Sequence, residues 1–207
     1  IYPCSMSMVD VGNLQTVWRD AFGPDATLQD MTESEAPYYF LMSNGDISGG
    51  RNFLNIDIGG GTTDMFFVVR ENGEKHGYYT SMRFAGNDLW GDGVRGMARL
   101  TNGFYRHVKK DLTWLAEDIK RQEDLIMGNA DSHMTSADAM AFLFRRDDPV
   151  NPKIPALIRS DKRLFPLLHV HFAAIIYHVA MILKKKGWEI PATINLTGMG
   201  SKYVYII

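Results

Sequence analysis

The chain has 207 residues, of which 45% are hydrophobic and 22% are charged, and its formal net charge is -2 at pH 7. These values are typical of a soluble globular protein with one large domain or two small lobes, and they give no reason to expect a nucleic acid or an acidic membrane as partner. The single cysteine, Cys4, excludes an internal disulfide and fits a reducing compartment, which we expect to be the cytoplasm.

Neither end of the sequence resembles a natural terminus. The chain begins at Ile1 without a Met or a secretory signal, and it stops inside an apolar run that ends at Ile207. We therefore expect it to be part of a longer protein.

The first half of the chain alternates between strands and helices. Apolar spacing predicts a strand at 1–6, a helix at 13–22, a short strand at 27–31 and a helix from 32 to about 42. A three-stranded meander follows, with strands at 53–58, 63–70 and 76–84. Asn72-Gly73 is typical of the tight turn between the last two strands.

The second half is predominantly helical. Helices are predicted at 93–107, 111–127 and 135–144, followed by a loop at 145–153, a helix at 164–186, a strand at 193–197 and a turn at 198–201. The aromatic residues of the helical part fall within helical patterns, so we expect them in the core rather than on a partner surface. They are Phe104, Tyr105, Trp114, Phe142 and Phe144.

The segment 165–183 is long and apolar enough to raise the question of a membrane span. It contains three histidines, His169, His171 and His178, which would be costly in lipid. A lysine run and Gly187 end it as a soluble helix is commonly ended. We expect a buried core helix and no membrane span. The spacing of the histidines does not fit a metal site.

The segment 57–64, Asp-Ile-Gly-Gly-Gly-Thr-Thr-Asp, connects two apolar strands. Glycines let the backbone turn sharply and approach a ligand, and successive N–H groups in such a turn can bind anionic oxygens. Asp57 and Asp64 would repel a bare phosphate, but they suit a phosphate that arrives with a divalent cation. The segment therefore indicates a metal-nucleotide site, and a glycine-rich hairpin with capping aspartates is the alternative.

Three further segments accompany it in a fixed order: 32–36 before it, and 85–88 and 196–201 after it. Together they resemble the second half of the ATPase domain shared by actin, the heat-shock chaperones and the sugar kinases, most closely the chaperone and bacterial actin-like branches. The resemblance implies an α/β fold, a ribonuclease-H-like lobe formed by residues 1–94 and 161–207, with a helical insertion at 95–160. It also implies a protein that binds and hydrolyses ATP with Mg²⁺.

The resemblance assigns a role to each of these segments. Asp57 and Thr62 would be catalytic, while Glu33, Asp57 and Asp64 would hold the metal through water, as suits Mg²⁺. The implied nucleotide-binding residues are Gly59, Gly60, Gly61 and Thr62 at the phosphates, Gly86, Asn87 and Asp88 near the ribose and phosphates, and Gly198, Met199, Gly200 and Ser201 under adenine. Lys120 and Arg121 are candidates for base contacts, with a solvated helix face as the preferred alternative. A helix N-terminal carboxylate is the alternative for Glu33, and a polar turn capped by Asp88 is the alternative for 86–88.

The sequence departs from the family in three ways. Ala85-Gly86 stands where a double glycine is usual, and Met199 separates two glycines that are usually adjacent. The family's first phosphate motif, on an N-terminal lobe, is absent, so that lobe is an expected partner and the isolated fragment is expected to be inactive. A small-molecule kinase lobe and a non-hydrolysing filament or scaffold protein remain alternatives. A protein client or self-assembly is possible in either case.

Overall fold

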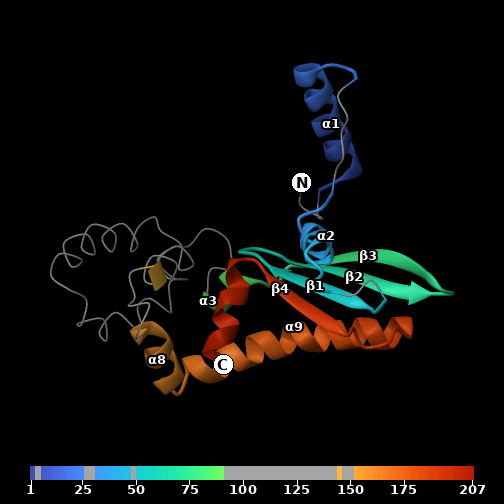
Figure 1. Cartoon of the computed structure of the whole chain (residues 1–207). Coiled ribbons are helices and arrows are strands. Elements are labelled where there is room, and N and C mark those ends of the chain that lie inside the picture. The colour runs from blue at the N-terminus through green and yellow to red at the C-terminus, as the bar shows by residue number, and fades with distance from the viewer. Residues whose placement is uncertain (3–5, 26–30, 48–49, 91–143, 146–151) are drawn as a thin grey trace. The chain divides into compact units, whose positions relative to one another are not determined.

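The computed structural model describes residues 1–2, 6–25, 31–47, 50–90, 144–145 and 152–207. Most of the predicted helices 93–107, 111–127 and 135–144 lie outside this part, as do Lys120, Arg121 and four of the five aromatic residues, Phe144 excepted. The described elements, shown in Figure 1, are α1 (Met8–Phe22), α2 (Ala36–Ser43), β1 (Phe53–Ile58), β2 (Thr63–Glu71), β3 (Glu74–Met82), α3 (Gly86–Trp90), α8 (Lys153–Ser160), α9 (Leu164–Lys186), β4 (Thr193–Thr197) and the 3-10 helix η2 (Met199–Ile206).

The described strands form one four-stranded mixed sheet in the order β3-β2-β1-β4, visible side by side in Figure 1. β1, β2 and β3 are the predicted antiparallel meander, and β4 joins it parallel to β1. Asn72 and Gly73 both have positive φ, at 53° and 89°, as a two-residue hairpin turn of type I′ requires. The protein is therefore a mixed α/β protein with helices flanking the sheet.

Both faces of β1 and β2 are buried. On the face covered by α2, Tyr38 packs against Phe53 and Phe66, with ring centroids 5.2 and 5.9 Å apart, and Val68 completes this cluster. Side chains alternate between the faces of a strand, so Leu54, Ile56, Met65 and Phe67, each 0–1% exposed, fill the opposite face. Because β1 and β2 are buried on both faces, their sequences are nearly continuous apolar runs and not alternating patterns.

The first helix is longer than predicted and faces solvent. α1 begins at Met8 rather than at residue 13, because the Ser7 hydroxyl accepts a hydrogen bond from Asp10 N (3.2 Å) and caps the helix. Its predicted apolar side is exposed, including Trp18 at 42% and Phe22 at 65%, and Val11 is the buried residue of the helix. Most of the predicted strands 1–6 and 27–31 lies outside the described residues. An isolated parallel bridge pairs Tyr2 with Thr32, one residue beyond the second predicted strand.

Two elements near the C-terminus were not predicted. α8 occupies residues at the end of the segment expected to be an insertion, and Pro155 lies in its first turn, where proline is tolerated. The final apolar run, for which no element was predicted, belongs to η2, which begins at Met199 within the predicted turn 198–201. Arg159 of α8 donates hydrogen bonds to the carbonyl oxygens of Ile206 and Tyr205, both at 2.9 Å, and these bonds tie the two elements together.

α9 has the bounds that the sequence predicted. Leu168, Ile175 and Val179 lie on its buried stripe, whereas Val170 and Tyr177 are 65% and 67% exposed, so the prediction of a buried core helix holds for one side only. By length and composition α9 is the one helix in the described part of the chain that could cross a membrane, and 33% of its most apolar window is buried. The core helices of many soluble proteins pass the same test.

The chain divides into two compact units. One contains residues 1–58, 63–82 and 183–198, and the other contains 59–62, 83–182 and 199–207. The predicted boundaries of the insertion, 95 and 160, stay a prediction, since most of that segment lies outside the described residues. We treat each unit by itself below and call them the sheet unit and the helical unit.

In the sheet unit, Glu71 at the end of β2 holds Trp188, which follows α9. The two Glu71 carboxylate oxygens accept hydrogen bonds from Trp188 Nε1 (2.8 Å) and the Tyr78 hydroxyl (2.7 Å). These bonds favour the charged carboxylate, so they lower the pKa of Glu71 below its ordinary value. The carboxylate therefore stabilises the sheet unit while it is ionised.

We expect Glu71→Gln to destabilise the protein at neutral pH and to have little effect in acid. A carboxyl group with a lowered folded-state pKa contributes stability above its unfolded-state pKa, and this contribution is lost as the pH falls through the folded-state pKa. Urea unfolding of both proteins across the acidic range measures the difference. Glu74→Gln, which removes an exposed carboxylate across the same turn, is the matched control. An equal loss of stability at every pH would contradict the prediction.

Candidate functional site

Asp57 and Asp64 lie directly opposite each other in the ladder between β1 and β2. They share the α2 face of the sheet with Asn55, since side chains alternate. Asp64 is 9% exposed, and its buried Oδ1 atom has no hydrogen-bond partner among the residues that the structure describes. Like charges in directly opposed positions are unfavourable, and a buried carboxylate oxygen without a partner is costly. Both features are those expected where a cation binds.

Three effects raise the pKa of Asp57 above its ordinary value. Burial is the largest, followed by the charges of Asp64 and Glu33, while a hydrogen bond from the Thr197 side chain acts in the opposite direction. Glu33 is itself exposed. The hydrogen bonds before α2 join Thr32 N to the Glu35 side chain (3.4 Å) and Glu35 N to the Thr32 side chain (3.2 Å). The alternative for Glu33, a carboxylate near a helix N-terminus, stays open.

A buried network positions Thr197, a residue to which the sequence analysis gave no role. Asn55 is fully buried, and its Nδ2 atom donates to Thr197 Oγ1 (3.2 Å) and to the Ser34 carbonyl oxygen (3.0 Å). Asn195 Nδ2 donates to Asn55 Oδ1 (2.7 Å). A buried side-chain amide is costly unless it is hydrogen-bonded. The polar Asn55 inside the apolar run of β1 was therefore the feature of the sequence that could have indicated this network.

Gly198 follows β4 and lies against the end of β1. Its φ is +81°, and a Cβ at this position would overlap with Asp57 Oδ1 and the Ile58 carbonyl oxygen. The sequence resemblance placed Gly198 under adenine. In the sheet unit, the glycine is required because the chain passes so close to the Asp57 carboxylate.

The glycine-rich turn from Gly59 to Thr62 belongs to the helical unit. It is closed by one hydrogen bond from Gly59 N to the Thr62 carbonyl oxygen (2.9 Å). The N–H groups of Gly60, Gly61 and Thr62 donate to none of the described residues. Three successive N–H groups without a partner among the described residues are available to bind an anion.

The start of α3 supports this turn. Gly86 N donates to the Gly59 carbonyl oxygen (3.0 Å) and Asn87 N to the Gly60 carbonyl oxygen (2.8 Å). A Cβ at Gly86 would lie 3.1 Å from the Gly59 carbonyl oxygen, so glycine allows this contact without a shift of the neighbouring backbone. The predicted groups are therefore neighbours, but the Gly86 and Asn87 N–H groups hold the turn rather than pointing to a ligand. Asp88 Oδ2 accepts from Ala85 N (2.8 Å), which is the cap proposed in the alternative interpretation.

The predicted adenosine residues Met199, Gly200 and Ser201 form the first turn of η2. Gly200 is buried and Met199 is 51% exposed. A cavity of about 300 Å³ lies beside them within the helical unit, at the small end of the range for ligand pockets. Its lining consists of Phe144, Arg145, Met199, Lys202, Tyr203 and Tyr205. Phe144, expected in the core, packs on Tyr203 with ring centroids 5.2 Å apart.

The described residues hold no group of three or more His, Cys, Asp or Glu side chains close enough to bind a metal ion directly. His171 is buried beside Phe84, with ring centroids 4.6 Å apart, and burial lowers its pKa. The expectation that Asp57, Asp64 and Glu33 hold a metal through water stays a prediction.

Comparison with protein-family models finds no match, and none of the curated proteins is significantly similar to the chain.

We expect Gly198→Ala to destabilise the protein by about 3 kcal/mol, because the methyl group adds a steric overlap to the cost of a left-handed backbone. Thermal or urea unfolding measures the loss. Gly45 offers a matched control, since its φ is +77° and a Cβ there would have no neighbour within 4 Å. Gly45→Ala should cost about 1 kcal/mol, the backbone term alone. Equal losses in the two variants would show that the contact with Asp57 does not constrain position 198.

We expect Asp57→Asn to raise the melting temperature at neutral pH when divalent cations are chelated. A carboxyl group whose folded-state pKa is raised loses stability as the pH rises from its unfolded-state pKa through its folded-state pKa. The amide removes this penalty and can still accept the hydrogen bond from Thr197. The gain should shrink at acidic pH, where Asp57 is protonated. Asp46→Asn, at an exposed carboxylate, is the control, and a gain that does not depend on pH would contradict the prediction.

Proposed function

We propose that the chain is the ribonuclease-H-like lobe of an actin-like or chaperone-like ATPase, and that it binds Mg-ATP through the segment 57–62 and adenosine through 198–201. The observation that carries this proposal is the opposed pair Asp57 and Asp64, with the buried, unpartnered Asp64 Oδ1 atom. The sheet order β3-β2-β1-β4, with an antiparallel meander followed by a parallel strand after a long helix, supports the fold assignment.

The carboxylates fit magnesium bound through water. Mg²⁺ keeps several of its waters and takes few direct protein ligands, so oxygens that accept hydrogen bonds from those waters suit it. Asp64 offers a buried oxygen without a partner, and Asp57 is affected by the charges of both Asp64 and Glu33. When bound, the cation would neutralise charge on the phosphates.

The turn from Gly59 to Thr62 fits the phosphates. The N–H groups of Gly60, Gly61 and Thr62, which have no acceptor among the described residues, would donate to phosphate oxygens, and the Thr62 hydroxyl is a further donor. The bonds from Gly86 and Asn87 hold the turn in place without any ligand. Donors that are already oriented lose little entropy on binding, and fixed dipoles are the main means of stabilising a phosphoryl transition state.

Asp57 is the residue best suited to act on the attacking water. A hydrogen bond from Thr197 reaches its carboxylate, Asn55 in turn bonds to Thr197 Oγ1, and the backbone at Gly198 lies close to Asp57 Oδ1. A raised pKa brings a carboxylate closer to the range in which it can accept a proton from water during the reaction. We propose that Asp57 orients this water and accepts its proton, while Asp64 acts through the cation's water shell.

The cavity beside η2 fits the adenine ring. Phe144, Tyr203 and Tyr205 offer aromatic faces, and Arg145 offers a planar cation that can stack on a base. Met199 lines the cavity, which is consistent with the expectation that it reshapes the pocket between the two glycines. An opposite wall would come from the proposed N-terminal lobe.

In the complete ATPase, we expect Asp57→Asn to lower ATP hydrolysis by about a hundredfold or more while ATP binding stays within about tenfold of wild type. The amide keeps the size of the side chain but cannot accept a proton from water. Asp64→Asn should have a milder effect. Single-turnover hydrolysis and calorimetric titration with Mg-ATP measure the two quantities.

Asp46→Asn provides the control for the loss of one negative charge. If Asp57→Asn hydrolyses ATP at the wild-type rate, Asp57 has no catalytic role, and a scaffold that keeps the fold without turnover becomes the better assignment. If neither aspartate variant changes hydrolysis or binding, neither residue takes part in the nucleotide site.

A further inference from the structure

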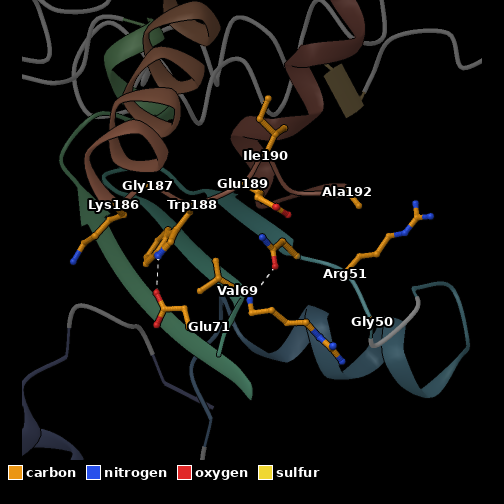
Figure 2. Close-up of a pocket in the computed structure, with 12 residues that line it drawn as sticks. Gly50, Arg51, Val69, Glu71, Lys186, Gly187, Trp188, Glu189, Ile190 and Ala192 are labelled. Carbon is orange, nitrogen blue, oxygen red and sulfur yellow. Dashed lines mark hydrogen bonds between the residues drawn. The ribbon is translucent and has the colours of Figure 1, made fainter. Parts of the chain in front are cut away.

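Among the described residues, two cavities of the sheet unit share no lining residue with the candidate nucleotide site. Figure 2 shows the one between Arg51 and Trp188, where the Glu71 carboxylate is already bonded to Trp188. The other lies between α2 and β3 and has a volume of about 430 Å³, which is in the range of small-molecule pockets. We call it the tyrosine cavity after three of the residues that line it, Tyr38, Tyr39 and Tyr79.

The strand register places the tyrosine cavity on the α2 face of the sheet. Tyr79 lies opposite Phe66, and Gly77 lies opposite Val68. Phe66 and Val68 belong to the cluster on the α2 face, so their partners on β3 share that face. A Cβ at Gly77 would lie 2.9 Å from Phe66 Cε2. Any larger residue at position 77 would therefore displace the Phe66 ring and enter the cavity.

Four aromatic rings in successive contact line the tyrosine cavity. Tyr38 meets Tyr39 and Phe66 edge to face, with ring centroids 5.4 and 5.9 Å apart. Phe66 in turn stacks on Tyr79, with centroids 4.8 Å apart. The two inner rings, of Tyr38 and Phe66, are buried, whereas Tyr39 and Tyr79 are 51% and 46% exposed. The two outer tyrosines therefore keep ring surface that a ligand can contact.

The Glu35 carboxylate also lines the cavity and interacts with both outer tyrosines. Burial raises the pKa of Tyr39 and of Tyr79, and the charge of Glu35 and a hydrogen bond to it raise both further. Glu35 accepts a third hydrogen bond from Thr32 N (3.4 Å). The cavity thus holds a negative charge that has three hydrogen-bond donors and no counter-ion among the described residues.

These groups favour an organic cation without N–H donors. A cation is attracted to the face of a tyrosine ring, and a neighbouring carboxylate adds to this attraction. A primary ammonium group would bring three donors to a carboxylate that already accepts three hydrogen bonds, and donors without a partner are costly. A quaternary ammonium group has no donors to satisfy. The cation of the cavity itself, Lys75, donates to the Tyr38 hydroxyl (3.4 Å) rather than to Glu35.

We propose that the tyrosine cavity binds a small soluble molecule with a quaternary ammonium group, which lies against the rings of Tyr39 and Tyr79 beside the Glu35 carboxylate. The aromatic rings supply contact area, and the carboxylate supplies the opposite charge. The site needs no magnesium and no nucleotide, and it goes beyond the function proposed above.

The test is a titration of the chain with choline and, separately, with its uncharged analogue in which carbon replaces the nitrogen, in the absence of magnesium and nucleotide. The amide signal of Gly77 reports on the cavity by NMR, and nuclear Overhauser effects between the choline methyl protons and the Tyr79 ring protons report direct contact. We expect choline to shift the Gly77 signal to saturation. The uncharged analogue has the same shape, so it should bind about tenfold more weakly for lack of charge.

Glu35→Gln should weaken choline binding by about tenfold or more, because the amide lacks the negative charge but can still accept the hydrogen bond from Thr32 N. Tyr79→Leu should weaken binding by about fivefold, whereas Tyr79→Phe keeps the aromatic face and should bind within about threefold of wild type. The Tyr79 pair tests the proposal independently of Glu35, and melting curves check that each variant folds.

Glu74→Gln removes an exposed negative charge outside the cavity and should leave choline binding within about twofold of wild type. Lys75→Gln removes a positive charge from the cavity, so it should bind choline at least as tightly as wild type does. The proposal is overturned if choline does not saturate the Gly77 signal, if the uncharged analogue binds equally well, or if Glu35→Gln and Glu74→Gln weaken binding equally. Sedimentation of the chain with phosphatidylcholine vesicles would overturn the assignment to a soluble ligand, since that lipid head group carries the same ammonium group.

Discussion

The structure of the sheet unit depends on the parallel pairing of β1 with β4, which joins residues about 140 positions apart in the chain. A buried polar network fixes this pairing, because the Asn55 amide bonds to Thr197, Asn195 and the Ser34 carbonyl oxygen. A shift of one residue in either strand would leave this fully buried amide unsatisfied, and the cost of such a group makes the register specific. The position of Asp57, two residues along the same strand, follows from that register.

The hairpin of β1 and β2 carries like charges in opposed positions near its turn, where Asp57 faces Asp64. Opposed like charges cost stability, and proteins retain such arrangements chiefly where a ligand of opposite charge offsets the cost. This end of the hairpin therefore suits a cation.

Close backbone approach accounts for two of the glycines that the sequence analysis assigned to nucleotide binding. Gly198 allows the chain to pass the Asp57 carboxylate, and Gly86 allows α3 to bond to the Gly59 carbonyl oxygen. Both glycines support the candidate site by positioning other groups. The N–H groups left for an anion are those of Gly60, Gly61 and Thr62. A glycine pattern in a sequence does not distinguish these roles, since both require a missing side chain.

The sequence by itself determined the elements whose signals are local. The meander, the Asn72-Gly73 turn and the bounds of α9 follow from hydrophobic period and turn chemistry, which act over a few residues. The opposed aspartates followed from the hairpin that joins them. Only the tertiary structure decided what depends on distant residues: the network at Asn55, the role of Gly198 and the cavity between Arg51 and Trp188. Each of these unites segments more than 100 positions apart, and no short-range pattern records which side chains will meet when such segments pair.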